Sequence, residues 1–199
     1  MSSLSYIALG GSILTLLLLL VVFTIALLFV AGLHTHDKLS TSIEIDASPD
    51  EVWRTLTNFE QYPEWNPFMT RVVGKAESAE KIKVTIALPF KQSLDFNLLI
   101  DSVTPTKEMV WLGTTLEPKV LDGEHYFRIE KIEGGKTRFS QGEKFSGILL
   151  YVSWPLLKVS VTNNFNKMNE ALKARVEGIS VSNAAKAAEE KVHLKTGAA

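Results

Sequence analysis

The sequence predicts an α+β domain in which an antiparallel sheet is covered by a long C-terminal helix, preceded by one hydrophobic N-terminal helix. Three observations predict this class. The first 36 residues contain no Asp, Glu, Lys or Arg. Apolar and polar residues then alternate in short runs between about residues 70 and 147, as in strands with one buried face. An apolar stripe at spacings of three and four follows, which is typical of an amphipathic helix.

The N-terminal segment Ile7–Leu33 is almost unbroken apolar sequence. As a helix it would be about 40 Å long at ~1.5 Å per residue, enough to cross a hydrocarbon core of ~30 Å. A cleaved signal peptide is the alternative, but such peptides carry a basic n-region and an apolar core of ~7–15 residues. No Lys or Arg precedes this longer core. We therefore expect residues 1–36 to form a single-pass transmembrane anchor.

The composition says less about orientation and partners. Lys38 stands beside Asp37, and no Asn-x-Ser/Thr acceptor occurs, so a cytosol-facing domain is favoured. The chain has 21 basic and 22 acidic residues, which gives no electrostatic reason to expect a nucleic-acid partner. There is no cysteine, so disulfides, thiolate metal sites and a cysteine nucleophile are excluded. Neither a metal nor another cofactor is expected, and protein partners cannot be inferred.

The first elements after the anchor are a strand and two short helical segments. Polar and apolar residues alternate in Ser42–Ala47, which predicts a half-buried strand. Ser48-Pro49-Asp50-Glu51 then predicts a helix start, with Ser48 as cap and Glu51 completing a capping box. Asn58 is the expected end of this helix. A second helical or irregular segment, Phe59–Phe68, contains two prolines that limit regular helix.

The central part of the sequence predicts an antiparallel meander. Gly134-Gly135 marks a hairpin turn between its last two strands. The inward-facing residues recur at every second position in these runs. The alternating runs cover residues 82–90, 94–101, 109–116, 125–129 and 139–145.

The last element is a long helix that is expected to begin near Pro155 and to end at Gly178. Its apolar stripe is the one long enough to cover the sheet. Residues 179–199 are rich in Ser, Ala, Lys and Glu and predict a flexible tail, so the domain is expected to span residues 37–178. The stripe consists of Val161, Phe165, Met168, Leu172 and Val176.

Three stretches of the sequence carry a family resemblance: Ile45–Trp53 with Tyr62–Phe68, Gly123–Phe127, and Phe145–Gly147 with Met168–Lys173. Together with the order of elements, they resemble the helix-grip fold of the START-like superfamily, also called SRPBCC. Over roughly Leu39–Gly178, the sequence looks like the polyketide cyclase/dehydrase and lipid-transport branch, which includes cyclases, lipid carriers and members of unknown role. The resemblance implies a sheet wrapped around the long helix, with a cavity between them for a mostly apolar ligand.

His125 is the candidate catalytic residue, with Glu143 as its partner. The strand parity places His125 with Phe127, facing inward, and Glu143 with Phe145 on the next strand. Imidazole is the commonest general base near neutral pH, so the pair could abstract and return a proton during a cyclisation or dehydration. The alternative is that His125 is a hydrogen-bonded structural residue and Glu143 lies at the cavity rim.

Aromatic and inward-facing residues are the candidate ligand contacts. An aromatic cluster in the second helical segment could form a lid over the cavity, or it could be ordinary core packing. Arg128 and Asn164 could each anchor a polar ligand group. The expected cluster is Trp53, Phe59, Tyr62, Trp65 and Phe68, and the other expected contacts are Phe96, Phe127, Gln141, Phe165 and Met168.

Three functions fit these features. The leading one is a membrane-tethered binding or carrier domain for a lipid, isoprenoid or polyketide-like ligand, because an anchor places the cavity beside a reservoir of hydrophobic molecules. The second is a polyketide cyclase or dehydratase that uses His125 as general acid/base. The third is a scaffold whose cavity is vestigial.

Overall fold

The computed structural model describes residues 3–33, 36–115 and 118–196. A seven-stranded antiparallel sheet is formed within these residues, in the order β1-β7-β6-β5-β4-β3-β2. The predicted α+β class, an antiparallel sheet followed by one long C-terminal helix, is therefore confirmed. The elements are α1 (Ser3–Leu33), β1 (His36–Ile45), α2 (Pro49–Thr57), η1 (Phe59–Gln61), α3 (Tyr62–Trp65), β2 (Met69–Val73), β3 (Lys81–Ala87), η2 (Pro89–Lys91), β4 (Ser93–Thr104), β5 (Glu108–Thr115), β6 (Leu121–Lys131), η3 (Glu133–Gly135), β7 (Thr137–Ser146) and α4 (Leu150–Thr196).

The start of α2 forms as its sequence predicts. The Ser48 hydroxyl accepts the Glu51 backbone N–H, while the Glu51 carboxylate accepts the Ser48 backbone N–H at 3.0 Å, which completes the capping box. Asn58 is the C-terminal cap, and its backbone N–H donates to Arg54 O. The short segments η1 and α3 then follow, as the two prolines of that stretch predict.

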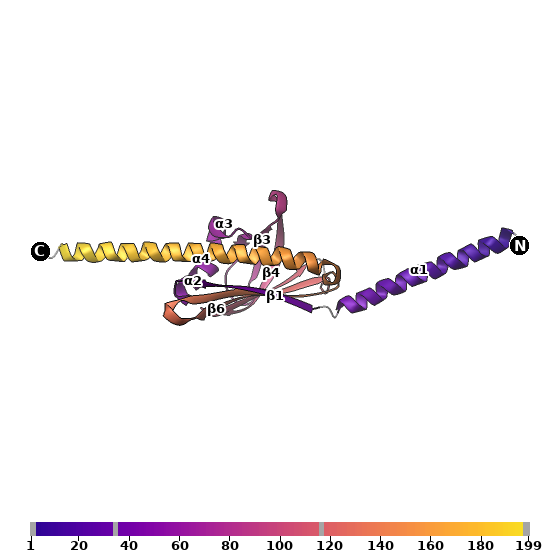
Figure 1. The fold of residues 1–199 in the computed structure, drawn as a ribbon, viewed down its shortest axis with the longest axis horizontal. Coiled ribbons are helices and arrows are strands. Elements are labelled where there is room, and N and C mark those ends of the chain that lie inside the picture. Colours follow the sequence, from indigo (N-terminus) through magenta and orange to yellow (C-terminus); the bar gives the residue numbers. More distant parts are fainter. Residues whose placement is uncertain (1–2, 34–35, 116–117, 197–199) are drawn as a thin grey trace.

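The sheet forms one wall of the domain and α4 packs across its concave face (Figure 1). Inward-facing residues of β6 alternate as expected, because His125, Phe127 and Ile129 are all buried. On α4, Phe165 and Met168 are buried by the same packing. The rest of the predicted stripe follows this pattern, since Leu172 and Val176 are also buried and Val161 is half-buried.

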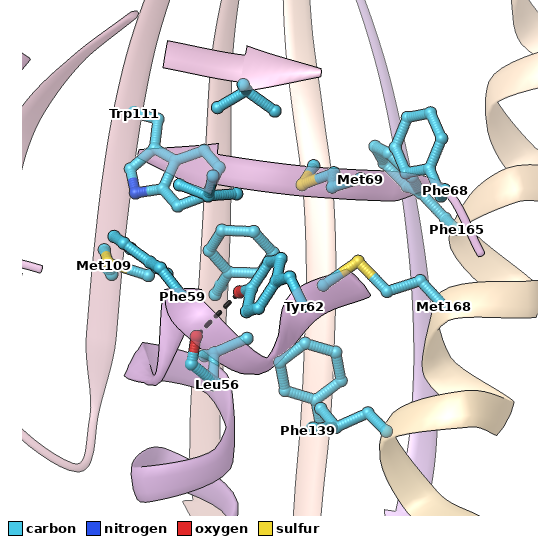
Figure 2. Close-up of a cluster of buried hydrophobic side chains, with 14 of the residues drawn as sticks. Leu56, Phe59, Tyr62, Phe68, Met69, Met109, Trp111, Phe139, Phe165 and Met168 are labelled. Carbon is cyan, nitrogen blue, oxygen red and sulfur yellow. Dashed lines mark hydrogen bonds between the residues drawn. The ribbon is translucent and has the colours of Figure 1, made fainter. Parts of the chain in front are cut away.

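The core between sheet and helices is rich in aromatic residues (Figure 2). Tyr62 is fully buried, and its hydroxyl donates to Leu56 O at 2.7 Å. That carbonyl lies in the last turn of α2, where it has no partner within the helix, so Tyr62 satisfies it. Burial raises the pKa of the Tyr62 hydroxyl, which keeps it a hydrogen-bond donor.

Three predicted boundaries are wrong. The strand expected to reach Phe90 ends at Ala87, and Phe90 lies in η2 with a φ of 59° and 95% of its surface exposed. The final helix begins at Leu150, five residues before Pro155, which lies inside the helix, and it continues past Gly178 to Thr196. The Ala, Lys and Glu residues after Gly178 favour helix strongly enough to continue it. Leu116, the expected end of β5, lies outside the described residues.

Other strands are longer than their alternating cores. β1 begins at His36 rather than Ser42, and β6 extends on both sides of the expected 125–129. β2 pairs with β3 at the edge of the sheet and has too few residues to show a clear alternation. The division of the chain at residues 36 and 178, with a flexible tail after it, stays a prediction.

The N-terminal hydrophobic segment forms the expected helix, α1. Over the part of the chain that the structure describes, however, no helix is long and apolar enough to span a membrane. The single-pass anchor expected from the sequence is therefore not supported by the structure.

Candidate functional site

A cavity of about 330 Å³ lies between the sheet and the first turns of α4. One wall is apolar and comes from β3 and β4, while β6 and β7 supply most of the polar groups on the opposite side. Leu88 and Leu94, at the β3–β4 turn, line the cavity and are also exposed, so they form part of its rim. The lining consists of Phe68, Met69, Val84, Ile86, Leu88, Leu94, Phe96, Leu98, Trp111, Gly113, Leu121, Asp122, Gly123, His125, Glu143, Phe145, Leu157, Ser160, Val161 and Asn164.

Two glycines shape the floor of this cavity. Gly113 on β5 lies directly opposite Gly123 on β6. A Cβ atom at Gly113 would clash with the side chain of Leu98, and one at Gly123 would clash with the Glu143 carboxylate. The absence of both side chains therefore lets Leu98 and Glu143 lean over the backbone of the sheet.

His125 and Glu143 come together as the strand parity predicts. They are register partners on β6 and β7, and both line the cavity. His125 Nδ1 lies 3.7 Å from Glu143 Oε2, which is too long for a hydrogen bond but within ion-pair range. The His125 side chain is 8% exposed and that of Glu143 is 21% exposed.

Aromatic rings enclose the imidazole of His125. The Phe127 ring centroid lies 4.4 Å away and that of Phe165 lies 4.9 Å away, while Trp111 follows at 6.2 Å. His125 Nε2 is buried and has no hydrogen-bond partner among the described residues. A buried imidazole nitrogen without a partner is expensive in a merely structural role, so it is available to a bound molecule.

The aromatic cluster predicted as a lid is divided between cavity and core. Phe68 lines the cavity and packs against Phe165 at 5.8 Å. Phe59 and Tyr62 are buried in the core instead, where the Phe59 ring lies 5.7 Å from that of Trp111 and 5.5 Å from that of Tyr62. Trp53 and Trp65 are half-buried at the edge of this core and are not among the lining residues. Most of this cluster is therefore core packing.

The remaining predicted contacts are also divided. Phe96 lines the cavity, whereas Phe127, Gln141, Phe165 and Met168 are buried in the core around it. Their role in ligand binding stays a prediction, and for the four buried residues it would be through positioning.

Gln141 joins the sheet to α4 through buried hydrogen bonds. Its Nε2 donates to Asn169 Oδ1 at 2.6 Å and to Phe165 O at 3.2 Å. Asn169 Nδ2 in turn donates to Thr41 Oγ1 on β1 at 3.0 Å. These bonds fix the rotation of α4 about its own axis, and so determine which α4 side chains face the cavity.

The two polar anchors considered from the sequence differ. Asn164 lines the cavity and is half-buried. Arg128 is exposed on the other face of the sheet, where its Nε donates to Glu108 Oε1 at 2.5 Å. Its guanidinium also lies over the ring of Tyr126, 4.5 Å from the centroid. Arg128 is therefore unavailable to the cavity.

Sequence reasoning missed several lining residues. Leu94 and Leu98 share the parity of Phe96, so alternation along β4 could have identified them. Trp111 gave no such signal, because it becomes the register partner of His125 only through the pairing of β5 with β6. Asp122 has the opposite parity to His125 on β6, so alternation would have placed it on the outer face. Leu157 lies four residues before Val161, so the helical spacing could have identified it, whereas the polar Ser160 gave no such signal.

A second hollow of about 770 Å³ is less suited to an apolar ligand. It is lined by residues of β1, β5, β6 and β7, and its charged side chains are half-buried or exposed. Lys144 Nζ there donates to Glu124 Oε1 at 2.5 Å, so these charges already neutralise each other. In the described part of the chain, no group of three His, Asp or Glu residues could hold a metal ion.

The sequence of residues 36–177 matches the family described as polyketide cyclase / dehydrase and lipid transport. The chain belongs to this family. The match covers the whole sheet, α2 and the part of α4 that packs on the sheet. It confirms the branch of the START-like superfamily that the sequence resembles. No curated protein matches the chain in sequence.

Solved structures show the same fold as this polyketide cyclase/dehydrase family member. A START superfamily protein from Mycobacterium smegmatis is 19% identical, with a TM-score of 0.60 over 73% of this chain and 99% of that chain. The Zhui aromatase/cyclase from Streptomyces sp. R1128 is 14% identical, with a TM-score of 0.60 over 72% and 94%. A norcoclaurine synthase point mutant from Thalictrum flavum is 10% identical, with a TM-score of 0.59 over 73% and 97%. At these identities the likeness establishes the helix-grip fold alone.

Proposed function

We propose that the domain binds a hydrophobic small molecule, such as a lipid, an isoprenoid or a polyketide-like compound, in the 330 Å³ cavity. The observation that carries this proposal is the lining, which is apolar on β3 and β4 and has a few polar groups on β6, β7 and α4. Ligand pockets in proteins have this composition and volumes of about 300–1,000 Å³. Membership of a family that includes cyclases and lipid carriers supports the same function.

Two measurements test this proposal. Native mass spectrometry of the full-length protein should detect a co-purified hydrophobic molecule. Residues 37–199, checked for folding by circular dichroism, should bind a neutral apolar fluorophore saturably and release it to competing ligands. A folded domain that shows no saturable binding across lipid and polyketide-like panels would contradict the proposal.

We also infer that α1 places the domain at a lipid bilayer. All the side chains described between Ile13 and Leu27 are exposed, and apolar residues occur on every face of the helix. A helix that is apolar all round is normally buried in a large core or in a membrane. The Thr24 hydroxyl donates to Leu20 O at 2.8 Å, so this side chain needs no water.

Alkaline carbonate extraction tests this placement. Burial of an apolar helix in lipid does not depend on screened charge, so the full-length protein should stay with membranes in high salt and carbonate. Residues 37–199 should be released under the same conditions. Recovery of the full-length protein in the carbonate supernatant would exclude an integral anchor.

The distance between His125 and Glu143 favours catalysis as a second function. A buried imidazole beside a carboxylate in an apolar cavity has the parts of a general acid/base. Conversion of His125→Gln keeps a polar group of similar reach but cannot shuttle a proton at neutral pH. In an enzyme, turnover of open-chain polyketide substrates should fall roughly 100- to 10,000-fold with little change in binding. In a carrier, the wild type should show no turnover to lose.

A further inference from the structure

Acidic side chains outnumber basic ones in the lining of the cavity. Its described lining includes the carboxylic acids Asp122 and Glu143 and the imidazole of His125, but neither Lys nor Arg. Asp122 Oδ2 accepts the backbone N–H of Lys119 at 2.9 Å, whereas its Oδ1 is buried without a partner. The Glu143 carboxylate has no hydrogen bond within the described chain, and the nearest ring nitrogen, His125 Nδ1, lies 3.7 Å from its Oε2.

The nearby basic side chains do not compensate this charge. Lys144, the neighbour of Glu143 on β7, has the opposite parity and binds Glu124 on the other face of the sheet. Arg128 on β6 is likewise bound to Glu108 outside the cavity. Lys158 on α4 is exposed and is not among the lining residues. The electrostatic potential inside the cavity is therefore set by hydrogen-bond acceptors and negative charge. Charges interact strongly there because the surrounding side chains are of low polarity.

Two features indicate that these acidic groups bind a ligand. The acids lie in a formed cavity, and His125 Nε2 on its wall is more than nine-tenths buried and has no hydrogen-bond partner. The gap of 3.7 Å between His125 Nδ1 and Glu143 Oε2 is also too long to satisfy the carboxylate. A group that donates hydrogen bonds would satisfy it.

We propose that the natural ligand is an apolar molecule bearing an amine, whose nitrogen binds at Glu143 beside His125 while its apolar body lies against β3 and β4. The inference rests on the proposed function, because it assigns a ligand class to the same cavity. A carboxylate or phosphate at this position would face Asp122 and Glu143 with no basic residue of the lining to pair with. A neutral alcohol would donate one hydrogen bond and lack the attraction between charges.

The test compares three ligands that share one aromatic body: naphthylmethylamine, naphthylmethanol and naphthoate. Each displaces neutral N-phenylnaphthylamine from the full-length protein, which is held in an amphipathic polymer, with the empty polymer as background. The amine should bind at least about tenfold more tightly than the carboxylate. The ammonium group pairs with the largely buried Glu143 carboxylate, whereas naphthoate would place a like charge beside it.

Matched variants assign the effect to a residue. In Glu143→Gln, amine affinity should fall at least about tenfold while that of the alcohol stays within about twofold. Glu124→Gln removes the same charge from the neighbouring strand, outside the cavity, and should leave the amine affinity unchanged. Gly123→Ala should weaken the amine as well, since a Cβ there displaces the Glu143 carboxylate without removing its charge.

The outcomes separate this inference from the proposed function. Naphthoate binding as tightly as the amine, or an equal loss in Glu143→Gln and Glu124→Gln, would overturn the amine assignment and leave hydrophobic binding standing. Absence of any displaceable fluorophore from the folded protein would overturn both. Amine preference that disappears only in Glu143→Gln and Gly123→Ala would support it.

Discussion

Conversion of Val161→Trp should block the cavity from the helix side. Val161 lies on α4, is half-buried and lines the cavity next to Asn164 and Leu157. The hydrogen bonds of Gln141 and Asn169 hold this face of α4 toward the sheet, so an indole at position 161 has to extend into the cavity. The cavity of about 330 Å³ has room for the ring, which keeps the destabilisation near the lower end of the ~1–3 kcal/mol typical of overpacking.

The expected loss of affinity follows from the atoms that are displaced. A Trp side chain has about seven more heavy atoms than Val, and these exclude a similar number of ligand atoms. Drug-sized ligands gain about 0.3 kcal/mol per heavy atom, so the loss is about 2 kcal/mol. That corresponds to roughly a 30-fold higher Kd.

Fluorophore titration of residues 37–199 measures this loss, with Val159→Trp as the matched control. Val159 is on the same helix but is 61% exposed and does not line the cavity. Thermal unfolding should show both variants folded, with only Val161→Trp impaired in binding. Equal affinity in both variants would show that the ligand does not occupy this cavity.

Three further changes test the site and its support. Tyr62→Phe leaves Leu56 O unsatisfied and should lower the free energy of unfolding by about 1–3 kcal/mol in chemical denaturation. The Glu177 carboxylate accepts the Asp46 backbone N–H and binds Lys173, which hold the pKa of that carboxyl below its ordinary 4.5. The contribution of Glu177 to the free energy of unfolding is therefore complete above about pH 4.5 and is lost as the pH falls through the lowered pKa. Glu177→Gln should lower the free energy of unfolding by about 1 kcal/mol at neutral pH, and this difference from the wild type should vanish in acid. Gly123→Ala should move Glu143 away from His125 with little loss of stability, visible as a changed histidine resonance in NMR spectra, and an unchanged resonance would contradict the contact.

The fold could be predicted because its elements carry strong local signals. The Ser48 and Glu51 capping box fixes the start of α2, and alternation along β6 fixes which of its residues face inward. The stripe on α4 identifies the one element able to cover the sheet. Each signal lies within a few residues of the structure that it determines.

The errors arose where local preference competes with context. Gly178 is of a residue type that often ends a helix, yet the Ala-, Lys- and Glu-rich sequence after it continues α4 to Thr196. Phe90 continues an alternating pattern beyond Ala87, but a short loop has to turn the chain from β3 into β4, and this places Phe90 in the solvent. Tight turns override alternation because backbone geometry is more restrictive there than side-chain burial.

The candidate site could be predicted only in part, because it depends on pairing between strands. Parity correctly placed His125 and Glu143 on the inner face, but their meeting depends on the register of β6 with β7. An aromatic cluster is equally consistent with a lid and with a core, since both require buried rings. The packing of Phe59 between Trp111 and Tyr62 decides for a core, and no spacing in the sequence encodes this packing.

The cavity itself argues against a scaffold with no ligand. The cavity opens to solvent at a rim that includes exposed Leu88 and Leu94, so without a ligand its apolar wall on β3 and β4 contacts water. Larger side chains at Val84 or Val161 would fill this space without altering the sheet. Each Å² of the apolar wall that a ligand removes from water contributes about 25 cal/mol. Binding of an apolar ligand should therefore raise the thermal unfolding temperature of the wild type and leave that of Val161→Trp nearly unchanged.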